Sequence, residues 1–245
     1  MKIGTTAISG TTFTKALIMG ESGSGKTFTA STIDGKVLVI SAEKGTLCLA
    51  DHAIDCLDLS VDDEGKPILE AKDRLTRLSG IFKLLQAGTS YTDVFLDSLT
   101  EVSELVITAL NKEFPDRKDS LPMYGENAKR MTSIIKSFRD LPYNVYMTCL
   151  AKSDKDENGR RFMGLSLTGK IADVAPQYFD FVFYVYPDEA AADGKRMFIT
   201  RKSATNICKD RSGKLLPVEP ADLGSIACKI AIPRPVNQPK EKKNV

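Results

Sequence analysis

Eight consecutive residues, from Gly20 to Thr27, carry the clearest chemical signal in this sequence. Their order fits the phosphate-binding pattern G-x-x-x-x-G-K-[ST] at every fixed position. Glycines let the backbone wrap closely around a phosphate, Lys26 would reach the β- and γ-phosphates, and the Thr27 hydroxyl would bind Mg²⁺. We therefore expect a nucleotide site built from one loop, whose residues are Gly20, Glu21, Ser22, Gly23, Ser24, Gly25, Lys26 and Thr27.

The segments around this loop favour a real site over a chance glycine turn. Residues 16–19 are apolar and predict a buried strand, and residues 25–33 predict a helix. A strand–loop–helix junction points backbone N–H groups and the positive end of a helix dipole at one place, where a phosphate would be held.

Two carboxylates follow other predicted strands. Asp97 ends the apolar run 94–96, and we expect it to hold Mg²⁺ with Thr27, although a helix-capping role is an alternative that Ser98 could also take. Glu43 follows the predicted strand 36–41 and would orient water as a general base if that strand lies beside or between the Gly20 and Asp97 strands. A surface glutamate is the alternative there, and Glu101 is a rival base. The expected catalytic residues are thus Lys26, Glu43 and Asp97.

A polar residue at the end of a third predicted strand would sense the γ-phosphate. The predicted strand 144–149 carries Thr148 near its end, which is our first candidate, and Lys152 is the second.

Strand and helix patterns alternate along the chain, which predicts an α/β fold with a mostly parallel central sheet flanked by helices. The later segment 179–209 has strands without long helices between them and should add antiparallel strands at the sheet edge. We expect one domain over residues 1–228 and a basic, disordered tail over 229–245. Strands are expected at 14–19, 36–41, 55–59, 92–97, 144–149, 179–186 and 197–201, and helices at 25–33, 46–52, 68–86, 99–112, 123–140 and 169–177.

Composition excludes several classes of function. No apolar run approaches the length of a membrane helix, and the N-terminus has no secretion signal, so we expect a cytoplasmic protein without a membrane partner. The five scattered cysteines fit free thiols in a reducing compartment. With a single histidine, histidine-based hydrolysis and metal chemistry are poor candidates. Cys48, His52 and Cys56 would share one helix face, and we expect buried thiols there rather than zinc ligands.

The net charge of +2 gives no argument for nucleic acid, but the basic residues gather in the last third of the chain. They could form a surface for a polyanion, or equally a solvated hairpin and tail.

Together these pieces resemble the RecA-type ATPase layout. The segment 16–223 is similar to a phage family of small RecA-core nucleotide-binding proteins, some of which act in single-strand annealing or recombination. Further matching pieces are Ala42-Glu43-Lys44-Gly45, Met123-Tyr124-Gly125, Gly169-Lys170, Tyr178-Phe179-Asp180 and Lys209-Asp210-Arg211-Ser212-Gly213. The resemblance implies a Mg²⁺-dependent ATPase, with ATP and Mg²⁺ as cofactors, that assembles into homo-oligomers on single-stranded DNA in the host cytoplasm. A single-strand-binding protein would be a further partner.

RecA-like proteins hold DNA on loops that follow the later core strands. The corresponding segment here is 153–168, where Arg160, Arg161 and Phe162 are the candidate DNA-binding residues. A β-hairpin with its turn at residues 158–159 is a compatible interpretation. Such ATPases also complete their sites with a basic residue from a neighbouring subunit, for which the candidates are Lys170, Arg201 and Lys202.

The sequence leaves three alternative functions to compare with this one. A GTPase would need the asparagine that Ala151 replaces in the N-K-x-D pattern, and a small-molecule kinase would need more lid arginines than Arg160 and Arg161. The serious alternative is a nucleotide-switched binding module or loader that works through protein partners, with little or no DNA-stimulated turnover.

Overall fold

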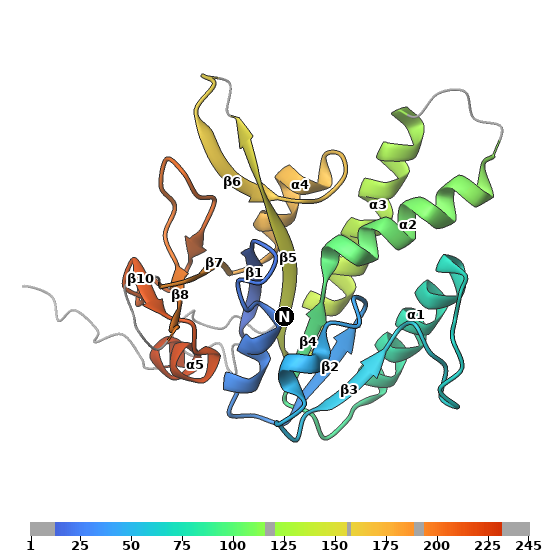
Figure 1. Cartoon of the computed structure of the whole chain (residues 1–245), viewed down its shortest axis with the longest axis horizontal. Helices are drawn as coiled ribbons and strands as arrows, with labels where there is room; N and C mark the ends of the chain where they lie inside the picture. The colour runs from blue at the N-terminus through green and yellow to red at the C-terminus, as the bar shows by residue number, and fades with distance from the viewer. Residues whose placement is uncertain (1–12, 116–120, 156–157, 189–193, 232–245) are drawn as a thin grey trace, which may run out of the picture.

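A computed structural model gives the fold and describes residues 13–115, 121–155, 158–188 and 194–231. These residues form a ten-stranded sheet with the main strand order β10-β8-β7-β1-β5-β4-β2-β3 (Figure 1). Strands β7, β1, β5, β4, β2 and β3 are parallel, whereas β6, β8, β9 and β10 pair antiparallel, which confirms the expected fold class. The strands are β1 (Lys15–Gly20), β2 (Val37–Ser41), β3 (Asp55–Asp58), β4 (Asp93–Asp97), β5 (Asn144–Lys155), β6 (Arg161–Leu165), β7 (Phe181–Pro187), β8 (Arg196–Ile199), β9 (Lys209–Asp210) and β10 (Val218–Pro220).

Helices cover both faces of the sheet. The α-helices are α1 (Ala71–Ala87), α2 (Leu99–Glu113), α3 (Leu121–Arg139), α4 (Ile171–Val174) and α5 (Leu223–Ala231), and the 3₁₀ helices are η1 (Thr27–Thr32), η2 (Thr46–Leu49) and η3 (Ala175–Tyr178). Helix α5 runs past the domain boundary expected at residue 228. Of the expected tail, residues 232–245 lie outside the described residues, as do Asp156 and Glu157 of the expected DNA loop.

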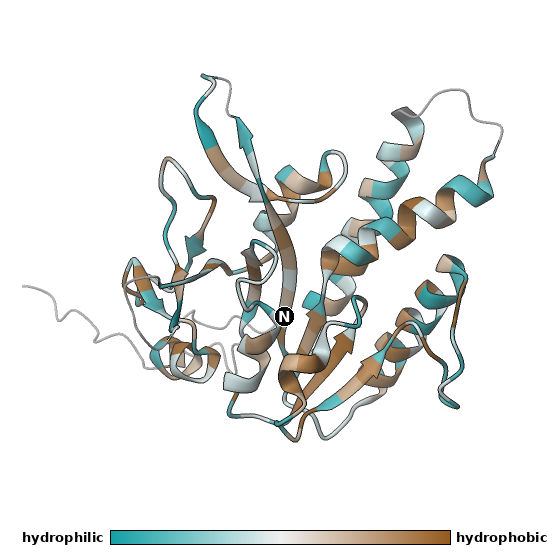
Figure 2. Ribbon diagram, viewed as in Figure 1, coloured by the Kyte–Doolittle hydropathy of each residue, from teal (hydrophilic) through white to brown (hydrophobic). Residues whose placement is uncertain are grey.

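The alternation of side chains along β1 shows how the core is divided. Leu17 and Met19 pack on the face covered by α1, α2 and α3, whereas Ala16 and Ile18 pack on the face covered by η1 and α5. Successive side chains of a strand point to opposite faces, so a strand covered on both sides must be apolar throughout. The central strands are accordingly coloured as hydrophobic in Figure 2.

The helix expected after the phosphate loop is a short 3₁₀ helix instead. Its hydroxyls bond back to carbonyls three residues earlier: Thr29 to Lys26 (2.6 Å), Ser31 to Phe28 (2.8 Å) and Thr32 to Thr29 (2.7 Å). Such local bonds compete with α-helical ones, and threonine is a weak helix former. The segment therefore keeps the tighter turn.

The expected helix face of Cys48, His52 and Cys56 is also corrected. Helix η2 ends at Leu49 and Cys56 lies in β3, and both thiols are exposed rather than buried. Within the described part of the chain, no cluster of acids, cysteines and histidine could hold a metal by itself.

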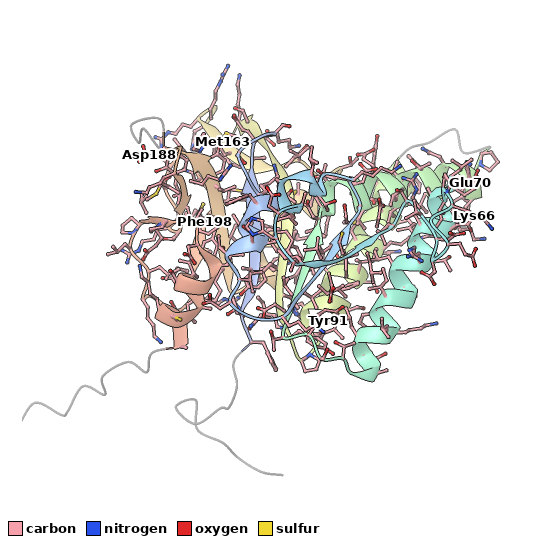
Figure 3. All side chains as sticks on the ribbon, turned by 60° about the horizontal axis from the view of Figure 1, so that its bottom comes forward. Lys66, Glu70, Tyr91, Met163, Asp188 and Phe198 are labelled. Carbon is pink, nitrogen blue, oxygen red and sulfur yellow. The ribbon has the colours of Figure 1, made fainter. Side chains whose placement is uncertain are left out.

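The carboxyl ends of the parallel strands meet at one end of the sheet. Figure 3 shows Met163, on β6, at this end and Tyr91, just before β4, at the other. Open α/β sheets bind their ligands at the carboxyl ends of their strands. Among the described helices, none has the length and apolar composition that crossing a membrane requires.

Candidate functional site

The phosphate loop leaves β1 at Gly20 and closes around the Lys26 side chain. Gly23 and Gly25 have φ values of 76° and 91°, a region that favours glycine. The buried Lys26 ammonium donates to the carbonyls of Gly20 (3.1 Å) and Glu21 (2.8 Å). Burial lowers the pKa of Lys26, while Glu43 and Asp97 oppose that shift. A cation surrounded by backbone carbonyls in this way is suited to exchange them for phosphate oxygens.

Asp97 lies at the centre of the polar contacts. One of its carboxylate oxygens accepts a hydrogen bond from Thr27 (2.7 Å), and the other accepts one from Thr148. Asp97 is 1% exposed, and Thr148 is fully buried. The three residues come from the phosphate loop, β4 and β5, so the sheet brings together groups that are far apart in sequence.

The oxygen donors at this point fit Mg²⁺. A carboxylate and a hydroxyl within hydrogen-bond distance are hard ligands, and Mg²⁺ typically uses one or two carboxylates together with substrate phosphates. Thr27 and Asp97 are therefore the residues that would hold the ion, as the sequence predicts.

Glu43 follows β2, which lies beside β4 while β5 separates β4 from β1. Its carboxylate accepts a hydrogen bond from the Ser98 hydroxyl, directly after Asp97, and the backbone N–H of Ala42 donates to the Asp97 carbonyl (2.6 Å). Glu43 is exposed to the cleft that the phosphate loop lines. This position suits a general base. The rival Glu101 lines the same cleft, and burial and then Glu43 raise its pKa.

The two sensor candidates lie in different places on β5. Thr148 contacts Asp97, whereas Lys152 does not line the cleft. Lys152 lies on the exposed part of the strand, where its ammonium is 3.9 Å from the Asp154 carboxylate. Position therefore favours Thr148.

The cleft itself has a volume of about 660 Å³. Six of the residues that line it are not predicted by the sequence patterns, namely Phe28, Cys48, Arg74, Thr100, Leu150 and Arg196. Arg196 begins β8, and its guanidinium lies 4.4 Å from the centre of the Phe28 ring. No local pattern in the sequence predicts this contact, because β8 and the phosphate loop are far apart in sequence and are brought together only by the pairing of the strands.

The end of β5 pairs antiparallel with β6 over residues 151–155 and 161–165, and we call these two segments, together with residues 158–160, the β5–β6 hairpin. Arg160 and Arg161 are exposed on it and Phe162 is half-buried. The last residues of β5 and the first residues of β6 are coloured as hydrophilic in Figure 2. The Met163 N–H donates to the Thr205 carbonyl (2.8 Å), which brings residues 201–206 beside the hairpin.

The three candidates for completing a neighbour's site are exposed and do not line the cleft of their own chain. Lys170 precedes α4, and Arg201 and Lys202 follow β8. The Arg201 guanidinium donates to the Leu215 carbonyl (2.6 Å).

Comparison with solved structures identifies the fold. The chain is similar to an ATPase from the type III secretion system of pathogenic bacteria, with a TM-score of 0.50 and 12% identity over 81% of this chain and 57% of that one. It is also similar to a KaiC-like protein from the archaeon Pyrococcus horikoshii, with a TM-score of 0.45 and 12% identity over 84% of each chain. The chain thus spans less than two thirds of the secretion ATPase. Fold and phosphate loop together define a P-loop ATPase of RecA-like fold.

The family follows from the sequence match. The AAA domain family AAA_24 matches residues 12–212, so the chain belongs to this family. No curated protein sequence gives a significant match. The RecA-like part of the resemblance is confirmed. Nucleotide binding, usually with Mg²⁺, is what membership implies, while the likeness to phage recombination proteins stays a prediction.

Proposed function

We propose that this protein hydrolyses Mg·ATP in the cleft and that single-stranded DNA on the β5–β6 hairpin stimulates the reaction, in phage recombination or annealing. One observation carries the proposal: β5 contacts Asp97 through Thr148 and then continues, as the same strand, into the exposed hairpin. Anything that binds the hairpin acts on a strand that touches the catalytic carboxylate.

The residues of the cleft divide the chemistry among them. Lys26 and the loop N–H groups hold the phosphates, and Thr27 and Asp97 hold the ion, which when bound would neutralise charge on the phosphates. Glu43 accepts a proton from the attacking water. The Ser98 hydroxyl fixes the direction of the Glu43 carboxylate.

The surface around the hairpin supports the DNA part of the proposal. Strand β6, which Arg161 begins, is joined through the Met163–Thr205 bond to the segment 201–206, which carries Arg201 and Lys202. Positive charges that follow the phosphate backbone of the nucleic acid, with an aromatic ring such as Phe162 on which a base can stack, are the usual means of holding single strands. The exposed basic residues outside the cleft also fit a homo-oligomer in which one subunit completes the ATP site of the next.

The test is ATP hydrolysis with and without single-stranded DNA across a salt series. We expect strong, salt-sensitive stimulation in the wild type, and we expect Arg160→Ala/Arg161→Ala to lose it while keeping the DNA-free rate. Removing two phosphate contacts should also lower the slope of log affinity against log salt by about 1.4.

The matched control is Lys72→Ala/Lys83→Ala, which removes two exposed lysines of α1. It should behave as wild type. Hydrolysis indifferent to DNA, without DNA binding at low salt, would refute the proposal and favour the nucleotide-switched module that acts through protein partners.

A further inference from the structure

The wall of the cleft beside the phosphate loop is made by Phe28 and Arg196. Phe28 directly follows Thr27, and the Arg196 guanidinium lies over its ring at 4.4 Å. Arg196 also lies close to the phosphate loop, since a Cβ atom on Gly25 would lie 2.0 Å from Arg196 Nε. A side chain at position 25 would therefore be strained by the positive φ and would displace the Arg196 side chain.

The Phe28 ring is fixed from a second side. The His52 ring meets it edge-on, with 5.9 Å between ring centres and 81° between planes. A planar guanidinium on a fixed aromatic ring forms a flat, polarisable surface, which suits another flat π-system better than it suits a phosphate.

The order of the strands places this surface away from the hydrolytic end of the cleft. Arg196 comes from β8, on one side of β1, whereas Glu43 follows β2, on the other side. The phosphate loop lies between them. A nucleoside triphosphate whose γ-phosphate faces Glu43 would therefore extend its base toward Phe28 and Arg196.

We propose that Phe28 and Arg196 form the nucleobase site, with the guanidinium stacking on the face of a purine. The inference rests on the proposed nucleotide-binding function of the cleft, and it gives Arg196 a role in affinity for the base rather than in hydrolysis. Stacking on an aromatic or guanidinium plane is a common way to hold a base without reading its edges.

The experiment compares two ligands, Mg·ATP and Mg·tripolyphosphate, which has no base. Binding of each to the full chain is measured by calorimetry for wild type, Arg196→Ala, Arg196→Lys and Phe28→Leu. We expect each variant to bind ATP about tenfold more weakly and tripolyphosphate as the wild type does. Arg196→Lys should not rescue, because lysine keeps the charge but loses the plane.

Intact binding of tripolyphosphate also shows that a variant is folded. Arg211→Ala, which removes an arginine paired with Asp180 outside the cleft, is the matched control and should bind both ligands normally. Equal loss of both ligands, rescue by lysine, unchanged ATP binding, or tighter ATP binding in Arg196→Ala would each overturn the inference. If the wild type itself binds neither ligand, or if Lys26→Ala binds both normally, the proposed nucleotide site fails instead.

Discussion

Hydrogen bonds between side chains orient the polar residues of the cleft. Asp97 accepts from Thr27 and Thr148, and Glu43 accepts from Ser98. Each carboxylate thus has a fixed direction before any ligand arrives. Preorganised groups of this kind lower the cost of reaching the reactive geometry.

Replacing Glu43 with glutamine separates binding from chemistry. Glutamine keeps the size and can accept from Ser98, but it cannot take a proton from water. Glu43→Gln should therefore bind ATP with wild-type affinity and hydrolyse it roughly 10²- to 10⁴-fold more slowly. Equilibrium binding and single-turnover hydrolysis measure the two effects.

Lys26→Ala is the contrasting variant, because it removes the ammonium that would hold the phosphates, and it should lose binding and turnover together. If Glu43→Gln loses ATP binding as well, Glu43 is not the base. Glu101, which lines the same cleft, would then be tested in the same way.

The loop between α3 and β5 is tied to β1 by a buried lysine. The Lys15 ammonium donates to the carbonyls of Leu141 (2.7 Å) and Tyr143 (2.5 Å). Burial lowers the pKa of Lys15 from 10.5 to about 8, although Asp140 and Asp180 oppose the shift. The lysine therefore stabilises the connection through its bonds while its charge is costly to bury.

This shift predicts how stability depends on pH. Between pH 8 and 10.5 the unfolded chain holds a proton on Lys15 that the folded chain releases, so the Lys15 contribution to the free energy of unfolding should rise with pH across that range. Urea unfolding of wild type and Lys15→Met at each pH measures the difference between the two proteins.

Lys15→Arg is the control for that measurement, because arginine stays charged and should remove the slope. A difference between wild type and Lys15→Met that is constant from pH 7 to 10 would contradict the prediction.

The parts of this fold that could be predicted from the sequence are those with a local pattern. The phosphate loop, Asp97 and Glu43 each sit at the end of an apolar strand, so their strands and their meeting point could be predicted. Strands β9 and β10 have two and three residues, too few for a pattern, and η1 departs from an α-helix because of its hydroxyl bonds. The contact of Arg196 with Phe28 depends on the pairing of β8 with β7 and β10, which no local spacing encodes.

A homo-oligomer on DNA would place one subunit's basic residue in the next subunit's cleft. The candidates Lys170, Arg201 and Lys202 are exposed, as this requires. Mixing two inactive variants tests the arrangement. A protein lacking the correct basic residue still has Glu43, and Glu43→Gln still has the basic residue.

The mixture should therefore recover DNA-stimulated ATP hydrolysis, up to about a quarter of the wild-type rate if subunits mix at random and only one kind of interface works. Each of the three candidates is replaced by alanine and mixed with Glu43→Gln in turn. Recovery with none of them would indicate that each subunit acts alone.

The length of β5 has one more consequence. Its twelve residues span about 40 Å, and Thr148 is the fifth of them, seven residues before the strand ends in the hairpin at Lys155. If occupancy of the hairpin alters affinity for ATP, thermodynamic reciprocity requires ATP to alter affinity for the hairpin's ligand by the same factor. A rigid strand between the two sites would then couple the affinity for ATP to the affinity for DNA in both directions. ATP hydrolysis would return the affinity for DNA to its value in the absence of ATP.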